Sequence, residues 1–119
     1  MPVRRPDHFD LAVPGSDARV RIRIAAHWFR RAAGRLAIPD RDAPCGLWLR
    51  PCRAVHTFGM RQAIDVVFLR ADGVVVKVVP ALEPWRIAAC RGARTTLELR
   101  AGLARTLRLA PGTALALPA

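Results

Sequence analysis

The segment that begins at Cys52 holds the side chains of this chain that are best suited to chemistry. Cys52, His56 and Met60 precede a strongly apolar run, and Asp65 stands inside that run. Thiols and imidazoles bind metal ions, and a thiol or a carboxylate next to a histidine can serve nucleophilic or acid–base catalysis. The residue types therefore suggest a metal site or a catalytic pair, and the path of the backbone must decide between them.

A metal site would have to gather Cys52, His56 and Cys90. The first two are four residues apart, but Pro51 and Gly59 bracket them and no helical pattern joins them. In an extended chain their Cα atoms lie about 13 Å apart, too far for zinc bonds of about 2.0–2.3 Å or for a hydrogen-bonded Cys–His pair. We therefore expect no metal and no other cofactor, with reduced thiols in the core. A site completed by Cys90 from another strand is the alternative.

Asp65 is the carboxylate that the sequence places most unusually. In an extended strand the residues on both of its faces are apolar, so Asp65 should be at least partly buried. A buried carboxylate needs hydrogen bonds, and we predict that it accepts them from N–H groups of the loop at 56–62 or from an arginine, which would clamp that loop. The alternative is a small hydrolase-like enzyme that uses Asp65 and His56. Glu98 is expected to face outward on its strand.

A second unusual segment runs from 83 to 94. It contains Trp85 beside Arg86, and a ring next to an arginine can bind a sugar, a base or an anion, although most such pairs only pack on the surface. Met60 is expected to fill core gaps with Phe58 and Trp48 rather than to bind a metal. A ligand site, if the chain has one, should lie where the 52–62 loop meets the 83–94 segment. Its candidate residues are His56, Met60, Asp65, Trp85, Arg86 and Arg91.

The composition is that of an ordinary globular protein. The chain has 119 residues, of which 52% are hydrophobic and 24% charged, so we expect a single domain over 1–119. Its apolar runs are too short to cross a membrane, and no apolar segment follows the basic N-terminal residues. We therefore expect no membrane contact and a cytoplasmic location, unless a signal peptide has been removed.

The formal net charge of +11 suggests a basic nucleic-acid-binding module as one hypothesis. Nineteen of the 20 basic residues are arginine, as GC-rich codons would produce, and the charge is spread, with +7 over 1–61 and +4 over 62–119. Arg19, Arg21 and Arg23 alternate with apolar residues and are interpreted as the solvated face of a strand. Specific nucleic-acid binding is therefore not preferred, and we expect a protein partner or a small ligand of unknown identity.

The pattern along the chain predicts strands with little helix. A hairpin is expected over 9–24 around Pro14-Gly15, followed by a helix over 25–36 with a helical apolar period. Asp72-Gly73 should join strands at 64–70 and 74–80 as a second hairpin. The pattern predicts a mainly β (β-rich α+β) fold, a small antiparallel β-sandwich or open barrel with one short helix packed on it. The other expected elements are strands at 46–50, 55–58 (or a loop), 95–100 and 114–117, a helical turn at 101–107, and an ambiguous segment at 83–89.

Five motifs between residues 45 and 112 carry a family resemblance. They are GLWL at 46–49, HTFGM at 56–60, IDVVFL at 64–69, DG at 72–73 followed by valines, and LELRAG at 97–102 with APG at 110–112. In this order and spacing the chain resembles an uncharacterised prokaryotic family, domain of unknown function 192. The family-like part covers about 45–117, after the hairpin and helix of 9–36. The resemblance implies a mainly β fold and no known activity, substrate or cofactor.

Our preferred hypothesis is a non-catalytic accessory or ligand-binding β domain. The alternatives are the hydrolase-like enzyme and the basic nucleic-acid-binding module. A structure separates them, because the enzyme requires His56 and Asp65 to converge in a cleft. The nucleic-acid module requires the arginine-lined strand to join other arginines in one broad basic face.

Overall fold

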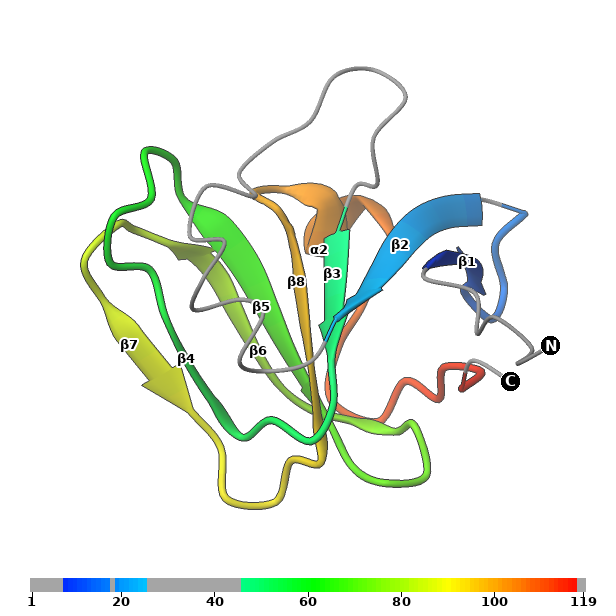
Figure 1. Cartoon of the computed structure of the whole chain (residues 1–119). Helices are drawn as coiled ribbons and strands as arrows, with labels where there is room; N and C mark the ends of the chain where they lie inside the picture. The colour runs from blue at the N-terminus through cyan, green and yellow to red at the C-terminus, as the bar shows by residue number, and fades with distance from the viewer. Residues whose placement is uncertain (1–7, 18, 26–45, 118–119) are drawn as a thin grey trace, which may run out of the picture.

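The computed structural model describes residues 8–17, 19–25 and 46–117 (Figure 1). Within these ranges eight strands form two sheets, and one short helix, α2 (Leu103–Thr106), packs against the larger sheet. No helix in these ranges is long and apolar enough to cross a membrane. The mainly β prediction is confirmed, and α2 is the helical turn predicted at 101–107. The strands are β1 (His8–Ala12), β2 (Arg19–Ala25), β3 (Gly46–Leu49), β4 (Ala54–His56), β5 (Ile64–Leu69), β6 (Val75–Leu82), β7 (Ile87–Ala89) and β8 (Thr95–Arg100).

The larger sheet is mixed, with the strand order β1-β2-β3-β8-β5-β6, while β4 and β7 form a separate two-stranded sheet. Every pairing in the larger sheet is antiparallel except that of β2 with β3, which is parallel and departs from the antiparallel arrangement expected. A parallel pair needs a crossover connection between its strands. The helix predicted at 25–36 falls in that connection: Ala25 ends β2, and the other residues of the prediction lie outside the described ranges.

The N-terminal hairpin follows the alternation of its sequence. Val20 and Ile22 are buried, whereas Arg19 and Arg21 are exposed. A guanidinium nitrogen of Arg21 lies 2.7 Å from Nε2 of His8 on the neighbouring strand. The prediction of a solvated face is therefore confirmed for Arg19 and Arg21, whereas Arg23 is half-buried.

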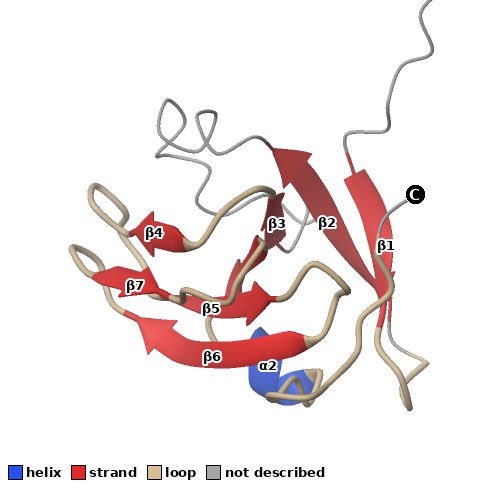
Figure 2. Cartoon of the chain, turned by 90° about the horizontal axis from the view of Figure 1, so that it is seen from below, coloured by secondary structure: helices blue, strands red, loops and turns tan. Residues whose placement is uncertain are grey.

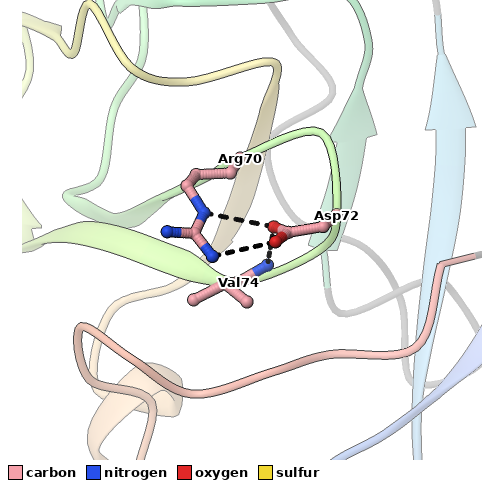
Figure 3. Close-up of polar contacts among 3 residues, drawn as sticks. All are labelled: Arg70, Asp72 and Val74. Carbon is pink, nitrogen blue, oxygen red and sulfur yellow. Dashed lines mark hydrogen bonds and ion pairs between the residues drawn. The ribbon is translucent and has the colours of Figure 1, made fainter.

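The β5–β6 hairpin, which is confirmed, closes through a turn at residues 70–73. The Gly73 N–H donates to the Arg70 carbonyl at 3.0 Å, and the φ of Gly73 is 89°, a value that favours glycine. The Asp72 carboxylate accepts hydrogen bonds from two nitrogens of Arg70 at 3.2 and 2.8 Å and from the Val74 N–H at 3.1 Å (Figure 3). The Arg70 guanidinium and, after it, the Val74 N–H lower the pKa of Asp72 below its usual range.

The larger sheet separates two hydrophobic cores, so its central strands are buried on both faces. Val67 and Leu97 contribute to one core, and Val66 and Phe68 contribute to the other. Glu98 in β8 is consequently buried, with 6% of its surface exposed, and the prediction that it faces outward is wrong. The alternation along β8 was compatible with one solvated face, but β8 lies between β3 and β5 with both of its faces covered.

The small sheet and α2 lie on opposite faces of the larger sheet (Figure 2). Val55 of β4 and Ala88 of β7 belong to the core beneath the small sheet, and Ala104 and Leu107 belong to the core beside α2. The small sheet is thus a cover over one face of the larger sheet, and its own outer side carries exposed residues.

The prediction of a last strand at 114–117 is wrong. Ala114 forms only an isolated bridge with Val74, and apart from a local turn bond from the Thr113 N–H to the Ala110 carbonyl, residues 112–115 form backbone hydrogen bonds with residues 73–75. Leu115 is buried in the core beside α2. The alternation of this segment therefore reflects the burial of one leucine and not pairing along a strand.

Candidate functional site

The small sheet joins the two segments that the sequence predicts to meet. β4 pairs antiparallel with β7, with Ala54 opposite Ala89 and His56 opposite Ile87. Side chains alternate along a strand, so Val55 and Ala88, which face each other, point into the core. The pairs on either side of them, Ala54 with Ala89 and His56 with Ile87, point outward. The predicted meeting of the 52–62 loop and the 83–94 segment is confirmed.

Aromatic rings continue this outward row beyond the strand ends. The His56 and Phe58 rings stack with centroids 4.7 Å apart and planes at 28°, and the Phe58 and Trp85 rings stack at 5.6 Å and 22°. Trp85 is 65% exposed and Ile87 is 67% exposed, so the row lies on the surface. We call this surface the aromatic face. Its residues are Ala54, His56, Phe58, Trp85, Ile87 and Ala89.

Two turns of the same kind hold the exposed rings. In the 57–60 turn the last N–H donates to the first carbonyl at 3.1 Å, and Gly59 at the third position has a φ of 81°. In the 83–86 turn Trp85 follows a proline, occupies the third position and has a φ of 63°. A type II turn favours proline at its second position and requires a positive φ at its third, where glycine or asparagine is usual. One turn has glycine at that position, and the other has a tryptophan.

Thr57 fastens the two turns together from inside the protein. Its side chain is fully buried, and its hydroxyl donates to the Glu83 carbonyl at 2.6 Å and accepts the Arg86 N–H at 2.9 Å. Its backbone N–H donates to the Arg86 carbonyl at 2.9 Å, and its carbonyl accepts the Trp85 N–H at 3.1 Å. The hydroxyl thus bridges the first and fourth residues of the 83–86 turn, and a single residue fixes the backbone on which Trp85 stands.

Exposed arginines lie in the segments that carry the aromatic face. Arg61 and Arg86 lie in or next to the two turns at its ring-bearing end, and the others lie in the loops at the far end of the small sheet. Glu83 is the acidic residue of these segments, and its carboxylate is 3.9 Å from the guanidinium of Arg86. Together, segments 50–63 and 83–94 therefore have a formal charge of +5. The six exposed arginines are Arg50, Arg53, Arg61, Arg86, Arg91 and Arg94.

Asp65 makes its hydrogen bonds in the interior. It is 1% exposed; Oδ1 accepts the Ala81 N–H at 2.8 Å, and Oδ2 accepts the N–H groups of Gly102 and Ala104 at 2.9 and 3.0 Å. Ala81 lies where the β5–β6 register shifts, and Gly102 is the N-cap of α2. The predicted burial of Asp65 is confirmed, but the prediction that it clamps the loop at 56–62 is wrong. A register shift in β6 supplies one donor, and the 56–62 loop is anchored by Thr57 instead.

The residues of the hypothetical metal site make other contacts. The Cys52 thiol donates to the Ala54 carbonyl at 3.2 Å, and Nδ1 of His56 accepts the Phe58 N–H at 3.2 Å. Cys52 lies in the core beneath the small sheet, and Cys90 packs against it, both as free thiols. In the part of the chain that the structure describes, no group of three His, Cys, Asp or Glu side chains could hold a metal ion. The alternative metal site therefore gains no support.

The candidate residues predicted from the sequence separate into groups. His56, Trp85 and Arg86 gather at the ring-bearing end of the aromatic face, and Arg91 lies beyond its other end. Met60 packs against the core beneath the small sheet. Both oxygens of Asp65 accept backbone N–H groups, so the hydrolase-like hypothesis lacks an accessible carboxylate.

Of the residues that build the aromatic face, Ala54, Phe58, Ile87 and Ala89 were not among the predicted candidates, and neither was Thr57, which anchors it. The prediction that Phe58 fills the core with Met60 and Trp48 is wrong, because Phe58 is 41% exposed and Trp48 is buried on the other side of the larger sheet. The sequence does hold a signal for this site. The residue after a proline in a type II turn is usually glycine or asparagine. A tryptophan at this position is not explained by the turn itself, and it therefore indicates another role for the side chain.

Comparisons with known proteins agree with this fold. The model of a family described as "DUF192: Uncharacterized ACR, COG1430" matches residues 11–117, which include most of the N-terminal hairpin. A protein of unknown function from Novosphingobium aromaticivorans is similar with a TM-score of 0.71 and 20% identity over 92% of this chain and 85% of that one. A protein from Sinorhizobium meliloti described as "a putative transcription regulator" is similar with a TM-score of 0.72 and 18% identity over 90% and 89%. At these identities the likeness concerns the fold alone. No curated protein matches the chain.

Proposed function

We propose that this chain, which belongs to the DUF192 family, is a non-catalytic binding domain whose ligand lies across the aromatic face. The observation that carries the proposal is the conformation of Trp85. A left-handed backbone costs an ordinary L-residue about 1–2 kcal/mol relative to the right-handed one. The matching position of the neighbouring turn is Gly59, which avoids this cost.

The tryptophan ring gains little from the fold in return. Trp85 is 65% exposed, and its ring contact with Phe58 joins it to another exposed side chain. A strained backbone that displays a large apolar ring is typical of a binding site, where such strain is held by the surrounding structure. Here the surrounding structure is Thr57, whose hydrogen bonds hold the turn before any ligand arrives. Such preorganisation lowers the entropy lost on binding.

The outward row around Trp85 supports the same proposal. A contiguous exposed apolar patch with a polar rim marks an interaction site more often than a chance feature of the surface. The aromatic face carries no Asp, Glu, Lys or Arg among its six residues, while arginines border it. Catalysis draws no comparable support, since a general base must present a lone pair to its substrate and Asp65 is enclosed.

A ligand screen by thermal shift tests the proposal with a matched pair of variants. Trp85→Gly removes the ring and suits the turn, whereas Ala81→Gly relieves a positive φ of 48° away from the aromatic face without changing charge. We expect some class among oligonucleotides, oligosaccharides and acidic peptides to stabilise wild type and Ala81→Gly but not Trp85→Gly. A ligand at 100 times its Kd adds about 2.7 kcal/mol, a shift of several degrees. If no stabilising ligand depends on Trp85, the proposal is wrong.

The same variants test, without any ligand, whether Trp85 contributes little to the stability of the fold. Because Trp85 is exposed and its backbone strained, Trp85→Gly should leave the free energy of unfolding within about 1 kcal/mol of wild type. A tryptophan that served the core would instead cost about 3–5 kcal/mol on truncation. Urea unfolding measures the difference. A loss of that size would show that Trp85 supports the fold rather than a ligand.

A further inference from the structure

We infer that the ligand of the aromatic face is single-stranded nucleic acid, with a base stacked on the open side of Trp85 and phosphates beside the surrounding arginines. This inference rests on the proposed function and adds the chemical class of the ligand. Single-strand binding surfaces combine aromatic side chains that stack on bases with cationic side chains that follow the phosphates. Both components are present around β4 and β7.

The charge around the face selects an anionic partner. Segments 50–63 and 83–94 expose six arginines against the single carboxylate of Glu83. A second copy of this chain would bring the same arginines against its own, and like charges across an interface are strongly unfavourable. Arginine also offers a planar fork of donors that matches phosphate oxygens and can stack on a base.

The ring geometry selects a planar group. Phe58 stacks with both His56 and Trp85, so its ring has two ring neighbours. Trp85 ends the stack, with Phe58 as its ring neighbour and 65% of its surface exposed. A base placed on the open side of Trp85 would continue the stack, and stacking tolerates any base because every base has a π-face.

The dimensions of the small sheet fit a short strand of nucleic acid. β4 and β7 have three residues each, which corresponds to about 10 Å between the ring-bearing end and the far end. Arg61 and Arg86 lie at the first end, and Arg53 and Arg91 flank the second. A strand of about four nucleotides, the lower end of known site sizes, would cover this distance.

A lipid surface is the other anionic partner to consider, and the rigid display of Trp85 argues against it. The strength of binding to a membrane interface increases with the apolar area that is buried and depends little on the angle of one ring. Stacking of a base, in contrast, is favoured by a ring that is held at a fixed angle. The positive φ of Trp85 and the hydrogen bonds from Thr57 fix that angle, which a membrane would not require.

Fluorescence anisotropy with a labelled oligothymidine of about twelve nucleotides tests the inference at about 150 mM salt. We expect Trp85→Gly to weaken binding by about 5- to 150-fold, the range found when one stacked ring is lost. Heparin, a polyanion without bases, should bind wild type and Trp85→Gly equally. Equal binding of the oligonucleotide by the two proteins would overturn the inference, because the attraction would then be charge alone.

A charge-matched pair of double variants tests the phosphate contacts. Arg61→Ala with Arg86→Ala should reduce the slope of log affinity against log salt by about 1.4, since each phosphate contact on a single strand contributes about 0.7. Arg105→Ala with Arg108→Ala removes the same charge from exposed positions in and after α2 and should change the slope less. Equal slopes in the two double variants would contradict the placement of the phosphates.

Vesicles containing phosphatidylserine separate failure of the inference from failure of the proposed function. If wild type binds vesicles but not oligothymidine, and Trp85→Gly loses vesicle binding, the nucleic-acid inference is wrong and the proposed binding face stands. If Trp85→Gly matches wild type with the oligonucleotide, the vesicles and the wider ligand screen, both are wrong. Retention of the wild-type melting temperature by the variant establishes that a loss of binding is not a loss of fold.

Discussion

Asp65 and Thr57 are buried polar side chains that anchor two different parts of the molecule. They are 1% and 0% exposed, and each gathers backbone groups from segments distant in sequence. Asp65 holds an irregular part of β6 and the start of α2, whereas Thr57 holds the turn that displays Trp85. Burial and hydrogen bonding therefore do not distinguish an anchor of the fold from an anchor of a binding surface. The distinction lies in what the anchored backbone carries.

The two anchors also act on neighbouring parts of one short segment. Asp65 binds the N–H of Ala81, and Thr57 binds residues 83–86. Among the described residues, three other than glycine have a positive φ, and two of them, Ala81 and Trp85, lie in this segment. Two buried side chains thus hold the strained backbone of this segment. Asp65, the anchor of the fold, binds at Ala81, and Thr57, the anchor of the binding surface, binds on both sides of Trp85.

Removal of the fold anchor should have the largest effect. Asp65→Ala leaves three N–H donors without their acceptor, which should lower the free energy of unfolding by about 3 kcal/mol or more. For a domain of this size the melting temperature falls by roughly 10 °C. Thermal melts at neutral pH measure it. Asp65→Asn should lose less, because it keeps one acceptor. A more stable Asp65→Asn would assign Asp65 to function, since functional groups are often kept at the expense of stability.

His56→Ala serves as the comparison for Asp65→Ala. His56 is half-buried on the aromatic face, and water can replace its hydrogen bond to the Phe58 N–H. We expect a smaller loss of stability than for Asp65→Ala. A loss as large would mean that the small sheet depends on its outer row as much as the larger sheet depends on its buried carboxylate.

Removal of the surface anchor should have an intermediate effect on stability and a local effect on structure. Thr57→Val keeps the shape but leaves the partly buried Arg86 N–H and Glu83 carbonyl without the hydroxyl as partner, at a cost of about 1–3 kcal/mol. Amide hydrogen exchange should accelerate at Trp85 and Arg86. Thr96→Val is the control, because its buried hydroxyl donates to the Cys52 carbonyl instead. If both variants accelerate exchange at Trp85 equally, Thr57 is not the specific anchor.

Removal of a buried hydroxyl that forms no hydrogen bond should raise the free energy of unfolding rather than lower it. Thr95 is fully buried at the start of β8, and within the described residues its Oγ1 has no hydrogen-bond partner. Thr95→Val keeps the volume and removes the unsatisfied polar group, so we expect a gain of about 1 kcal/mol. Urea unfolding detects it. A loss would mean that the hydroxyl is satisfied in solution.

Loss of the exposed ion pair between Arg70 and Asp72 should have the smallest effect on stability. The dependence of that stability on pH reveals the effect. The pKa of Asp72 is lowered in the folded state, so its contribution to stability is fully present above its unfolded value of about 3.9 and is lost as pH falls through the lower folded value. Asp72→Asn should therefore be slightly less stable than wild type at pH 7 and equal to it at about pH 2. A stability difference that persists in acid would have a source other than this carboxylate.

Local patterns in the sequence were sufficient to predict much of the fold and only part of the site. β-branched runs around Asp72-Gly73 predict the hairpin, and Asp65 between apolar residues predicts a buried carboxylate. The donors of Asp65 could not be predicted, since they depend on a register shift and on a helix start that only the folded sheet brings near. The burial of Glu98 likewise depends on the central place of β8 in the sheet.

That central place of β8 also sets the order of events during synthesis. β3 and β5 are both made before β8, yet in the sheet they meet only through it. The β5–β6 hairpin is complete at Leu82, and it and the β1–β2–β3 unit therefore remain separate, with open apolar edges, while residues 83–94 are added, about 1–2 seconds at about 5–20 residues per second. The nascent chain is most exposed to aggregation in that interval, and the arrival of β8 closes both edges together.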